Sequence, residues 1–382
     1  MRVITTTDDL AAFARELKSR PYVAVDTEFM RERTYWPILC LVQAAAEGAE
    51  AIIDPMAEGL DLAPFLEVLA EPGIVKVFHA ARQDVEIFHQ LMGRVPAPIF
   101  DSQIAAMACG FGDQIGYEPL VRGLLGASID KGSRFTDWSR RPLSPQQLAY
   151  ALSDVTFLRD AYPLLVGRLE EEGRRAWVEE EMAALADPSL YRIAPEDAWM
   201  RLKLRGVRPN ELGPIVKLAE WREREAQARD IPRGRILKDE AIFELARLRP
   251  KTPDDLARAR SIPAGYERSR AGQQMIEAIQ QGAAIDRRSL PDIERAERRA
   301  PPPADVVDLL KVLLKRQCEA YDVAPKLIAS AADIEAIALD DEADVPALHG
   351  WRRDVFGALA LRLKRGEIAL KLKGAGVEIV EA

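Results

Sequence analysis

The chain has 382 residues, of which 48% are hydrophobic and 30% are charged, an ordinary composition for a folded protein. No apolar run approaches the ~20 residues that a membrane-spanning helix needs, and the first residues lack the apolar core and cleavage site of a signal peptide. The three cysteines (Cys40, Cys109 and Cys318) are too few and too scattered for a disulfide framework or a zinc site. We therefore expect two or three domains, no membrane association and a reducing, cytoplasmic location.

The net charge of −8 hides an uneven distribution. Residues 1–200 carry 19 basic and 31 acidic side chains, whereas residues 201–300 carry 23 basic and 16 acidic ones. The acidic part suits metal binding and the basic part suits a polyanion. Charge alone leaves open the alternative that the arginine-rich helices are simply solvated.

Strand and helix patterns alternate in the first half of the chain. We predict strands at 22–29, 37–46, 50–55, 74–80 and 98–102, and helices at 62–73, 81–93 and 103–110. The first three strands follow one another closely and indicate a meander. From Pro119 onward the pattern is helical. These elements predict an α/β domain with a mixed sheet over residues 1–195.

The second half predicts two helical units. Residues 187–197 form a linker with two prolines, and residues 209–290 contain several short amphipathic helices. Three consecutive prolines in 288–305 stop any helix there. A second helical unit follows over residues 306–382. Both units start with a long helix followed by a proline-bearing loop and shorter helices, so we interpret them as two copies of one small all-α design.

Two acids stand at the end of the first long strand pattern, in "YVAVDTEF". Because side chains alternate along a strand, Asp26 and Glu28 project from the same face. Paired carboxylates of this kind suit a hard cation such as Mg²⁺ or Mn²⁺. An isolated Asp-x-Glu is more often a strand end that enters solvent.

Three further residues extend this pattern. Asp84 lies in the first turns of a helix, where an acid also complements the helix dipole. Tyr150 and Asp154 are four residues apart on a later helix and share a face, a spacing that is often only a surface hydrogen bond. Four acids in one cleft could not all stay ionised without cations. Two divalent ions would relieve the repulsion and would supply a hydrolytic mechanism at phosphorus.

At this point the sequence resembles the DEDD superfamily of 3′–5′ exonucleases, Tyr subclass, and within it the ribonuclease D family over nearly its full length. The resemblance rests on "DTEFMRERTYWPILCLVQ", "FHAARQDVEIF" and "YALSDVTFL", and on "DWSRRPLSPQQLAY" before the third motif. It implies a ribonuclease H-like fold for the first domain. Residues 209–290 resemble an HRDC domain, a small helical nucleic-acid-binding module, and residues 306–382 resemble a second, more divergent one. The acidic "DIEAIALDDEADVP" there leaves RNA contact by this unit open.

The resemblance also implies a role for each motif residue. Asp26 would bridge two Mg²⁺ or Mn²⁺ ions. Glu28 and Asp154 would bind the ion on the nucleophile side, and Asp84 would serve the second ion. Tyr150 would position the attacking water.

A second set of residues is predicted to bind nucleic acid. Arginines and aromatic side chains suit phosphates and single-stranded ends. The candidates are Arg31, Tyr35, His79, Arg134, Arg141, Arg233, Arg235 and Lys238. His79 has an alternative role as a hydrogen-bond partner under the sheet, and Asp101 is better explained as a helix cap than as a metal ligand.

The leading hypothesis is a monomeric 3′–5′ exoribonuclease that releases nucleoside 5′-monophosphates and trims structured RNA such as tRNA precursors. Nothing in the metal site distinguishes RNA from DNA, so a DNA exonuclease with the same site is an alternative. A non-catalytic RNA-binding protein is a second alternative, in which the helical units would be the working part.

Overall fold

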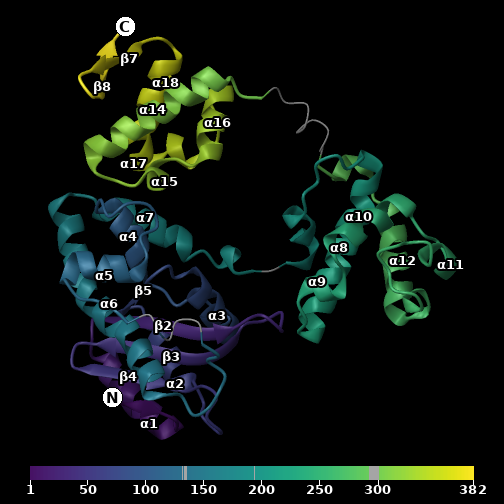
Figure 1. Ribbon diagram of the computed structural model, residues 1–382, viewed down its shortest axis with the longest axis horizontal. Helices are drawn as coiled ribbons and strands as arrows, with labels where there is room; N and C mark the ends of the chain where they lie inside the picture. Colours follow the sequence, from purple (N-terminus) through teal and green to yellow (C-terminus); the bar gives the residue numbers. More distant parts are fainter. Residues whose placement is uncertain (131, 133–135, 193, 292–300) are drawn as a thin grey trace. The chain divides into compact units, whose positions relative to one another are not determined.

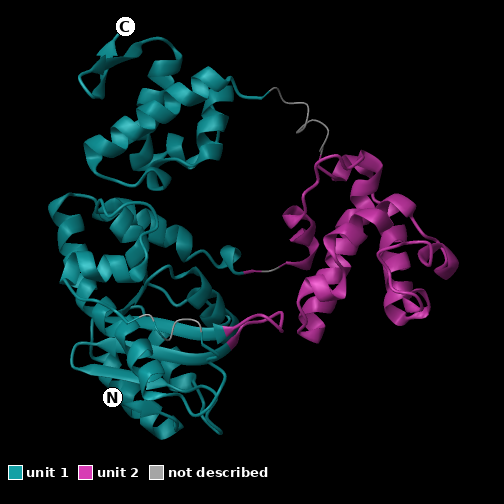
Figure 2. Ribbon diagram, in the orientation of Figure 1, with its two compact units in different colours: residues 1–29, 39–191, 301–382 teal, residues 30–38, 192–300 magenta. Residues whose placement is uncertain are grey.

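The computed structural model describes residues 1–130, 132, 136–192, 194–291 and 301–382. The chain forms two compact units (Figure 2). Neither unit is a continuous segment. Unit 1 contains Met1–Phe29, Leu39–Tyr191 and Pro301–Ala382, and unit 2 contains Met30–Ile38 and Arg192–Ala300.

A six-stranded sheet organises unit 1, in the order β1-β4-β3-β2-β5-β6. Strands β3 and β4 are antiparallel, whereas β1 with β4, β2 with β5, and β5 with β6 are parallel. The mixed sheet and the adjacency of the first three predicted strands are therefore confirmed, and the short β1 was not predicted. The strands are β1 Val3–Ile4, β2 Tyr22–Met30, β3 Ile38–Ala46, β4 Ala49–Ile53, β5 Val75–Phe78 and β6 Ile99–Asp101.

Strand β2 lies in the interior of the sheet, between β3 and β5. Val23, Ala24 and Val25 are completely buried because both faces of the sheet are covered. Asp26 is the first residue after these three that is only partly buried, and Thr27 is the last buried residue of the strand. The two acids of "YVAVDTE" therefore follow the completely buried part of the strand and are themselves partly buried.

Helices of unit 1 surround this sheet (Figure 1). Helix α6 packs against β4 and β5, and α1, which was not predicted, packs against α2 and β4. The helices are α1 Thr7–Lys18, α2 Ala63–Ala70, α3 Arg82–Met92, α4 Ser102–Ala108, α5 Tyr117–Leu125, α6 Pro145–Glu171 and α7 Arg175–Leu185, followed by the 3₁₀ turn η1 Pro188–Leu190.

Local sequence signals fix the ends of the two helices that carry candidate site residues. Helix α6 starts with Pro145 after a capping box in which Ser144 and Gln147 exchange side-chain and backbone hydrogen bonds. Helix α3 ends at Gly93, whose φ of 68° lies in the left-handed region that glycine adopts without strain.

Unit 2 is helical, with a core built mainly on α8, α10 and α12. Leu218, Leu245 and Met275 are completely buried in this core. The loop 30–38, which joins β2 to β3, belongs to this unit. The other elements are η2 Pro195–Arg201, α8 Pro209–Arg229, α9 Arg233–Ile236, α10 Asp239–Leu248, α11 Pro253–Leu256, η3 Tyr266–Arg268, α12 Arg270–Ala283 and η4 Arg287–Ser289.

The C-terminal segment packs within unit 1. Its prediction as all-α is wrong at the end, because β7 and β8 form an antiparallel hairpin. That hairpin has a half-buried strand pattern that suits a sheet, with apolar residues alternating with charged ones in "IALKLK". The elements are α14 Ala304–Tyr321, α15 Pro325–Ile328, α16 Ala331–Leu339, η5 Pro346–Leu348, α17 Gly350–Arg352, the π-helical turn η6 Arg353–Gly357, α18 Ala358–Lys364, β7 Ile368–Lys373 and β8 Gly376–Glu381.

None of the helices in the described part of the chain combines the length and the apolar character that crossing a membrane would require.

Candidate active site

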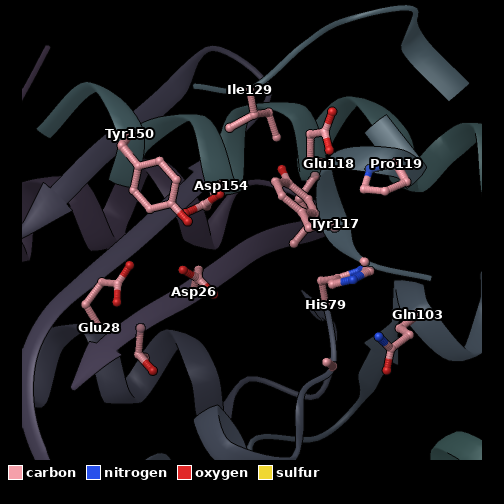
Figure 3. Close-up of a pocket in the computed structure, with 14 residues that line it drawn as sticks. Asp26, Glu28, His79, Gln103, Tyr117, Glu118, Pro119, Ile129, Tyr150 and Asp154 are labelled. Atoms are coloured by element: carbon pink, nitrogen blue, oxygen red, sulfur yellow. The ribbon is translucent and has the colours of Figure 1, made fainter. Parts of the chain in front are cut away.

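Three predicted acids converge at the end of strand β2. Asp26 and Glu28 project from the strand, and Asp154 approaches from helix α6 (Figure 3). One carboxylate oxygen from each lies within 4.8 Å of the others. This is the arrangement of oxygen ligands around a hard divalent cation.

The electrostatics of this cluster favour a bound cation. Burial raises the pKa of Asp26 well above its ordinary value, and the neighbouring carboxylate of Asp154 raises this pKa further. A cation between the two carboxylates would remove both penalties. Among the described residues, these three acids are the group of His, Cys, Asp and Glu side chains with metal-ligand geometry.

The fourth predicted acid, Asp84, lies beside this cluster but is not part of it. Its side chain is almost buried in the first turn of α3, and the hydroxyl of Thr27 donates to Asp84 Oδ1 over 2.5 Å. Burial raises the pKa of Asp84 well above its usual range, and the charge of Asp26 raises it further. Asp84 therefore contacts the same strand as the cluster and feels its field.

Tyr150 lines the same pocket, one helical turn before Asp154 (Figure 3). Its ring stacks against Trp138 with 6.2 Å between the ring centroids. Trp138 is buried, so it holds the tyrosine ring from behind. Figure 3 shows the hydroxyl of Tyr150 directed toward the acidic cluster.

The pocket has a volume of about 440 Å³ and continues away from the acids toward His79. The Nδ1 atom of His79 lies 2.9 Å from the hydroxyl of Ser102, and Nε2 is buried. Burial lowers the pKa of His79, although the charge of Asp101 opposes this effect. The imidazole is therefore neutral at pH 7.

A strained turn places His79 in the pocket. Ala80 has a φ of 59°, which is uncommon for a residue with a Cβ atom. The carboxylate of Asp101 accepts hydrogen bonds from the backbone N–H groups of Ala80 and Ala81, and it also caps helix α4 through Gln103 N–H. Asp101 is thus a cap, as predicted, and it also fixes the turn that precedes helix α3.

The far end of the pocket contains residues that the sequence analysis missed. Gln103 and Glu118 line it together with Tyr117, whose hydroxyl donates to the carbonyl of Ser153 over 3.1 Å. Burial raises the pKa of Tyr117, and the charges of Asp154 and Asp26 raise it further. No pattern around Tyr117 indicates this role, because its proximity to Asp154 depends on how α5 packs against α6.

Two predicted nucleic-acid contacts are corrected by the structure. Tyr35 is only 8% exposed and its hydroxyl donates to the carboxylate of Glu223, so its ring is not available to stack on a base. Arg141 forms a two-pronged ion pair with Asp54, over 2.7 Å at each prong, and also donates to the carbonyl of Cys40. Its guanidinium therefore stabilises the fold of unit 1.

The remaining predicted contacts differ in position. Arg31 is exposed on the loop after β2, and Arg134 lies outside the described residues. Arg233 and Arg235 are exposed on the short helix α9, and Lys238 is exposed at the start of α10. We call these last three residues the basic face of unit 2.

Comparison with known proteins agrees with this geometry. Residues 1–170 match a family model described as 3′-5′ exonuclease, and residues 213–279 match the HRDC domain. Ribonuclease D of Acidiphilium cryptum is 52% identical over 379 residues, which is 99% of this chain and 97% of that protein. Ribonuclease D of Nitrobacter hamburgensis is 49% identical and covers 100% of both chains.

The fold leads to the same family. The crystal structure of Escherichia coli RNase D, described as an exoribonuclease involved in structured RNA processing, superposes with a TM-score of 0.83. The two chains are 28% identical, and the match covers 95% of this chain and 98% of the other. With the three-acid cluster at the end of β2 and an HRDC domain in unit 2, this chain belongs to the ribonuclease D family of 3′–5′ exoribonucleases.

Proposed function

We propose that the chain removes nucleotides one at a time from the 3′ ends of structured RNA, such as tRNA precursors, by a two-metal-ion mechanism. The observation that carries this proposal is the convergence of Asp26, Glu28 and Asp154, with Tyr150 at the same pocket. The products would be nucleoside 5′-monophosphates, and the expected location is the cytoplasm.

The acids would hold Mg²⁺ or Mn²⁺. Asp26 would contact both ions, Glu28 and Asp154 would hold one, and Asp84, which accepts from the Thr27 hydroxyl, would serve the other. When bound, such ions lower the pKa of a water and stabilise charge on the leaving 3′ oxygen. The raised pKa values of Asp26 and Asp84 fit this assignment, because a cation favours the ionised form of both.

The protein's own groups would orient the reaction. The Tyr150 hydroxyl, directed toward the acids, would accept or donate a hydrogen bond to the attacking water. The ring is held by Trp138, so this hydroxyl is positioned before substrate binds. The neutral His79, which lines the pocket, would form a hydrogen bond with the terminal nucleotide.

RNA as the substrate is supported by the family and by the charge of unit 2. The Escherichia coli relative acts in structured RNA processing. Arg233, Arg235 and Lys238 present a basic face near the start of α10, which suits a phosphate backbone. We keep 1–195, 209–290 and 306–382 as the proposed domain boundaries, apart from the loop 30–38.

A labelled substrate tests the proposal. A tRNA precursor labelled at its 5′ end should give a stepwise ladder with Mg²⁺ and none with EDTA. Asp26→Ala should abolish the ladder, and a ladder that persists in this variant would refute the mechanism. A DNA strand of the same sequence, run in parallel, decides whether the site prefers ribose.

A further inference from the structure

The loop 30–38 is part of the fold of unit 2, although it grows directly out of the strand that bears the acids. Strand β2 ends at Met30, two residues after Glu28, and β3 begins at Ile38. Figure 2 shows residues 30–38 in the magenta of unit 2. The loop is therefore continuous in sequence with the strand of the active site, but it packs with the HRDC domain.

Tyr35 anchors the loop through its side chain. Its hydroxyl donates to Glu223 Oε1 over 2.5 Å, and the side-chain amide of Gln227 donates to the same hydroxyl over 3.2 Å. Burial raises the pKa of Tyr35 to about 12, and the hydrogen bond to Glu223 contributes to this increase. The phenol therefore remains a hydrogen-bond donor at neutral pH.

Asp230 anchors the loop through its backbone. The carboxylate oxygen Oδ1 accepts the N–H groups of Tyr35 and Trp36, over 3.0 and 2.9 Å. Asp230 itself has a φ of 49°, in the left-handed region where a non-glycine residue is strained. Together, Tyr35, Glu223 and Asp230 form a clamp on the loop, and we use this name for these three residues.

The clamp adjoins the basic face of unit 2. Asp230 ends helix α8, and helix α9 begins three residues later at Arg233. Glu223 is completely buried, and Arg233 Nη1 lies 3.7 Å from its Oε2 atom. Arg201 also pairs with Glu223, over 3.1 Å. The proposed phosphate-binding arginine is thus an electrostatic neighbour of the clamp.

The C-terminal segment uses the corresponding turn for docking. Asp322 ends helix α14 with a φ of 50°, as Asp230 ends α8. The backbone carbonyl of Asp322 accepts from Arg174, and Ala324 N–H donates to the carbonyl of Met107 in the exonuclease domain. In both helical units, the turn after the long helix therefore binds a segment that belongs to the exonuclease domain by sequence.

We propose that the clamp is a positioning device: it holds the loop that continues strand β2 on the HRDC domain, and so couples RNA binding at α9 to the strand that bears the acids. The proposal rests on RNA binding by the basic face, as proposed above. The proposal therefore predicts a difference between substrates. Loss of the clamp should weaken the binding of RNA that is long enough to reach α9, and it should not affect a dinucleotide. Tyr35 and Glu223 act here through the loop and not through contact with substrate.

The test uses the full-length protein with Mg²⁺ and two substrates, a tRNA carrying a 3′ trailer and a dinucleotide. Tyr35→Phe removes only the hydroxyl and keeps the buried ring. We expect it to raise KM for the long RNA about tenfold, the effect of losing one hydrogen bond to a buried charge. The rate on the dinucleotide and kcat on the long RNA should change less than twofold.

Tyr191→Phe is the matched control. Tyr191 is also buried, and its hydroxyl donates to the carbonyl of Leu185, far from the clamp in sequence. This variant should leave both substrates unaffected. Adding Tyr35→Phe to Glu223→Gln should raise KM no further than Glu223→Gln alone, because the contact that Tyr35→Phe removes is already weakened in that variant.

Other outcomes separate the clamp from the proposal on which it rests. Suppose that Arg235→Ala raises KM for the long RNA. If Tyr35→Phe then impairs both substrates equally, or impairs neither, the proposed role of the clamp is refuted. If Arg235→Ala leaves that KM unchanged, RNA binding by α9 is refuted, and the proposed role of the clamp is refuted as well.

Discussion

The two helical regions, 209–290 and 304–382, have the same succession of elements and use one of them in opposite ways. In each, a long helix ends at an aspartate with positive φ, a four-residue helix follows, and a third helix comes next. The four-residue helix is "RGRI" in α9 and "PKLI" in α15. Its last residue, an isoleucine, is buried in both regions.

The third residue of this short helix distinguishes the two regions. Arg235 is exposed in α9, whereas Leu327 is buried in α15. Around α15, the backbone N–H of Lys326 donates to Asp113 and its Nζ to Gln114, both in the exonuclease domain. The same helical design therefore carries exposed basic residues in one copy and docks on the exonuclease domain in the other.

A second contact shows how firmly the C-terminal region is docked. Trp351 stacks on Trp177 of helix α7, with 4.3 Å between ring centroids and an angle of 7°. Arg352 is buried, pairs with Glu180 over 3.0 Å and with Glu181, and donates to the carbonyl of Leu327. Within the described residues of the HRDC region, the exposed arginines of α9 have no comparable burial.

The largest expected effect tests this docking. Arg352→Ala removes a buried side chain that pairs with the exposed Glu180 and the partly buried Glu181 and donates to the Leu327 carbonyl, so we expect unit 1 to lose about 3 kcal/mol of stability. Thermal unfolding of the full chain measures this loss. Arg353→Ala, an exposed neighbour, is the control and should change the melting temperature by less than ~1 °C. Equal effects of the two variants would show that the C-terminal region is not held by this contact.

The next effect separates catalysis from RNA binding. Tyr150→Phe should lower kcat about 100-fold with Mg²⁺, because the attacking water loses the hydroxyl that orients it. RNA affinity measured in EDTA should remain within twofold of the wild type. A variant that loses affinity and keeps kcat would place Tyr150 in substrate binding and not in the reaction.

A smaller effect contrasts α9 with α15 directly. Arg233→Ala and Arg235→Ala should each lower the slope of log affinity against log salt by about 0.7, the value for one phosphate contact on a single strand. Lys326→Ala, in the corresponding helix α15, should leave the slope unchanged because its side chain is engaged with Gln114. Fluorescence anisotropy over a salt series measures all three. An equal change for Lys326→Ala would remove the distinction between the two copies.

The smallest effect concerns pH and only unit 1. The folded pKa of Asp26 is raised above 3.8, so the folded metal-free protein binds this proton more tightly than the unfolded chain. Stability is therefore lost as pH rises from about 4 through the raised pKa. At pH 7.5 in EDTA, Asp26→Asn should melt roughly 2–4 °C higher than the wild type. With excess Mg²⁺ the order should reverse, because only the wild type gains from the metal.

Unit 2 provides the internal comparison for that measurement. Its described residues contain no cluster of acids with metal-ligand geometry, so its unfolding should not depend on Asp26→Asn or on Mg²⁺. Hydrogen exchange in helix α12 follows unit 2 separately. If exchange there changes as much as exchange in β2, the two units do not unfold independently.

The sequence by itself determined the parts of this protein that depend on local periodicity. The alternation in "YVAVDTEF" set Asp26 and Glu28 on one face, and the four-residue spacing set Tyr150 and Asp154 on one side of α6. Capping signals such as Ser144 and Gly93 fixed the helix ends. Three motifs were sufficient to indicate the exonuclease family and its mixed sheet.

Only the tertiary structure decided which surface each side chain meets. Tyr35 and Arg141 are residue types that often contact nucleic acid. In this structure Tyr35 is buried against Glu223, and Arg141 is paired with Asp54. Both partners are distant in sequence, by 188 and 87 residues, so no local pattern encodes them. The same reason explains the loop 30–38, which continues the strand that bears the acids but places Tyr35 in the core of the HRDC domain. The type of a side chain limits the partners that it can bind, whereas long-range packing determines which partner it meets in the folded protein.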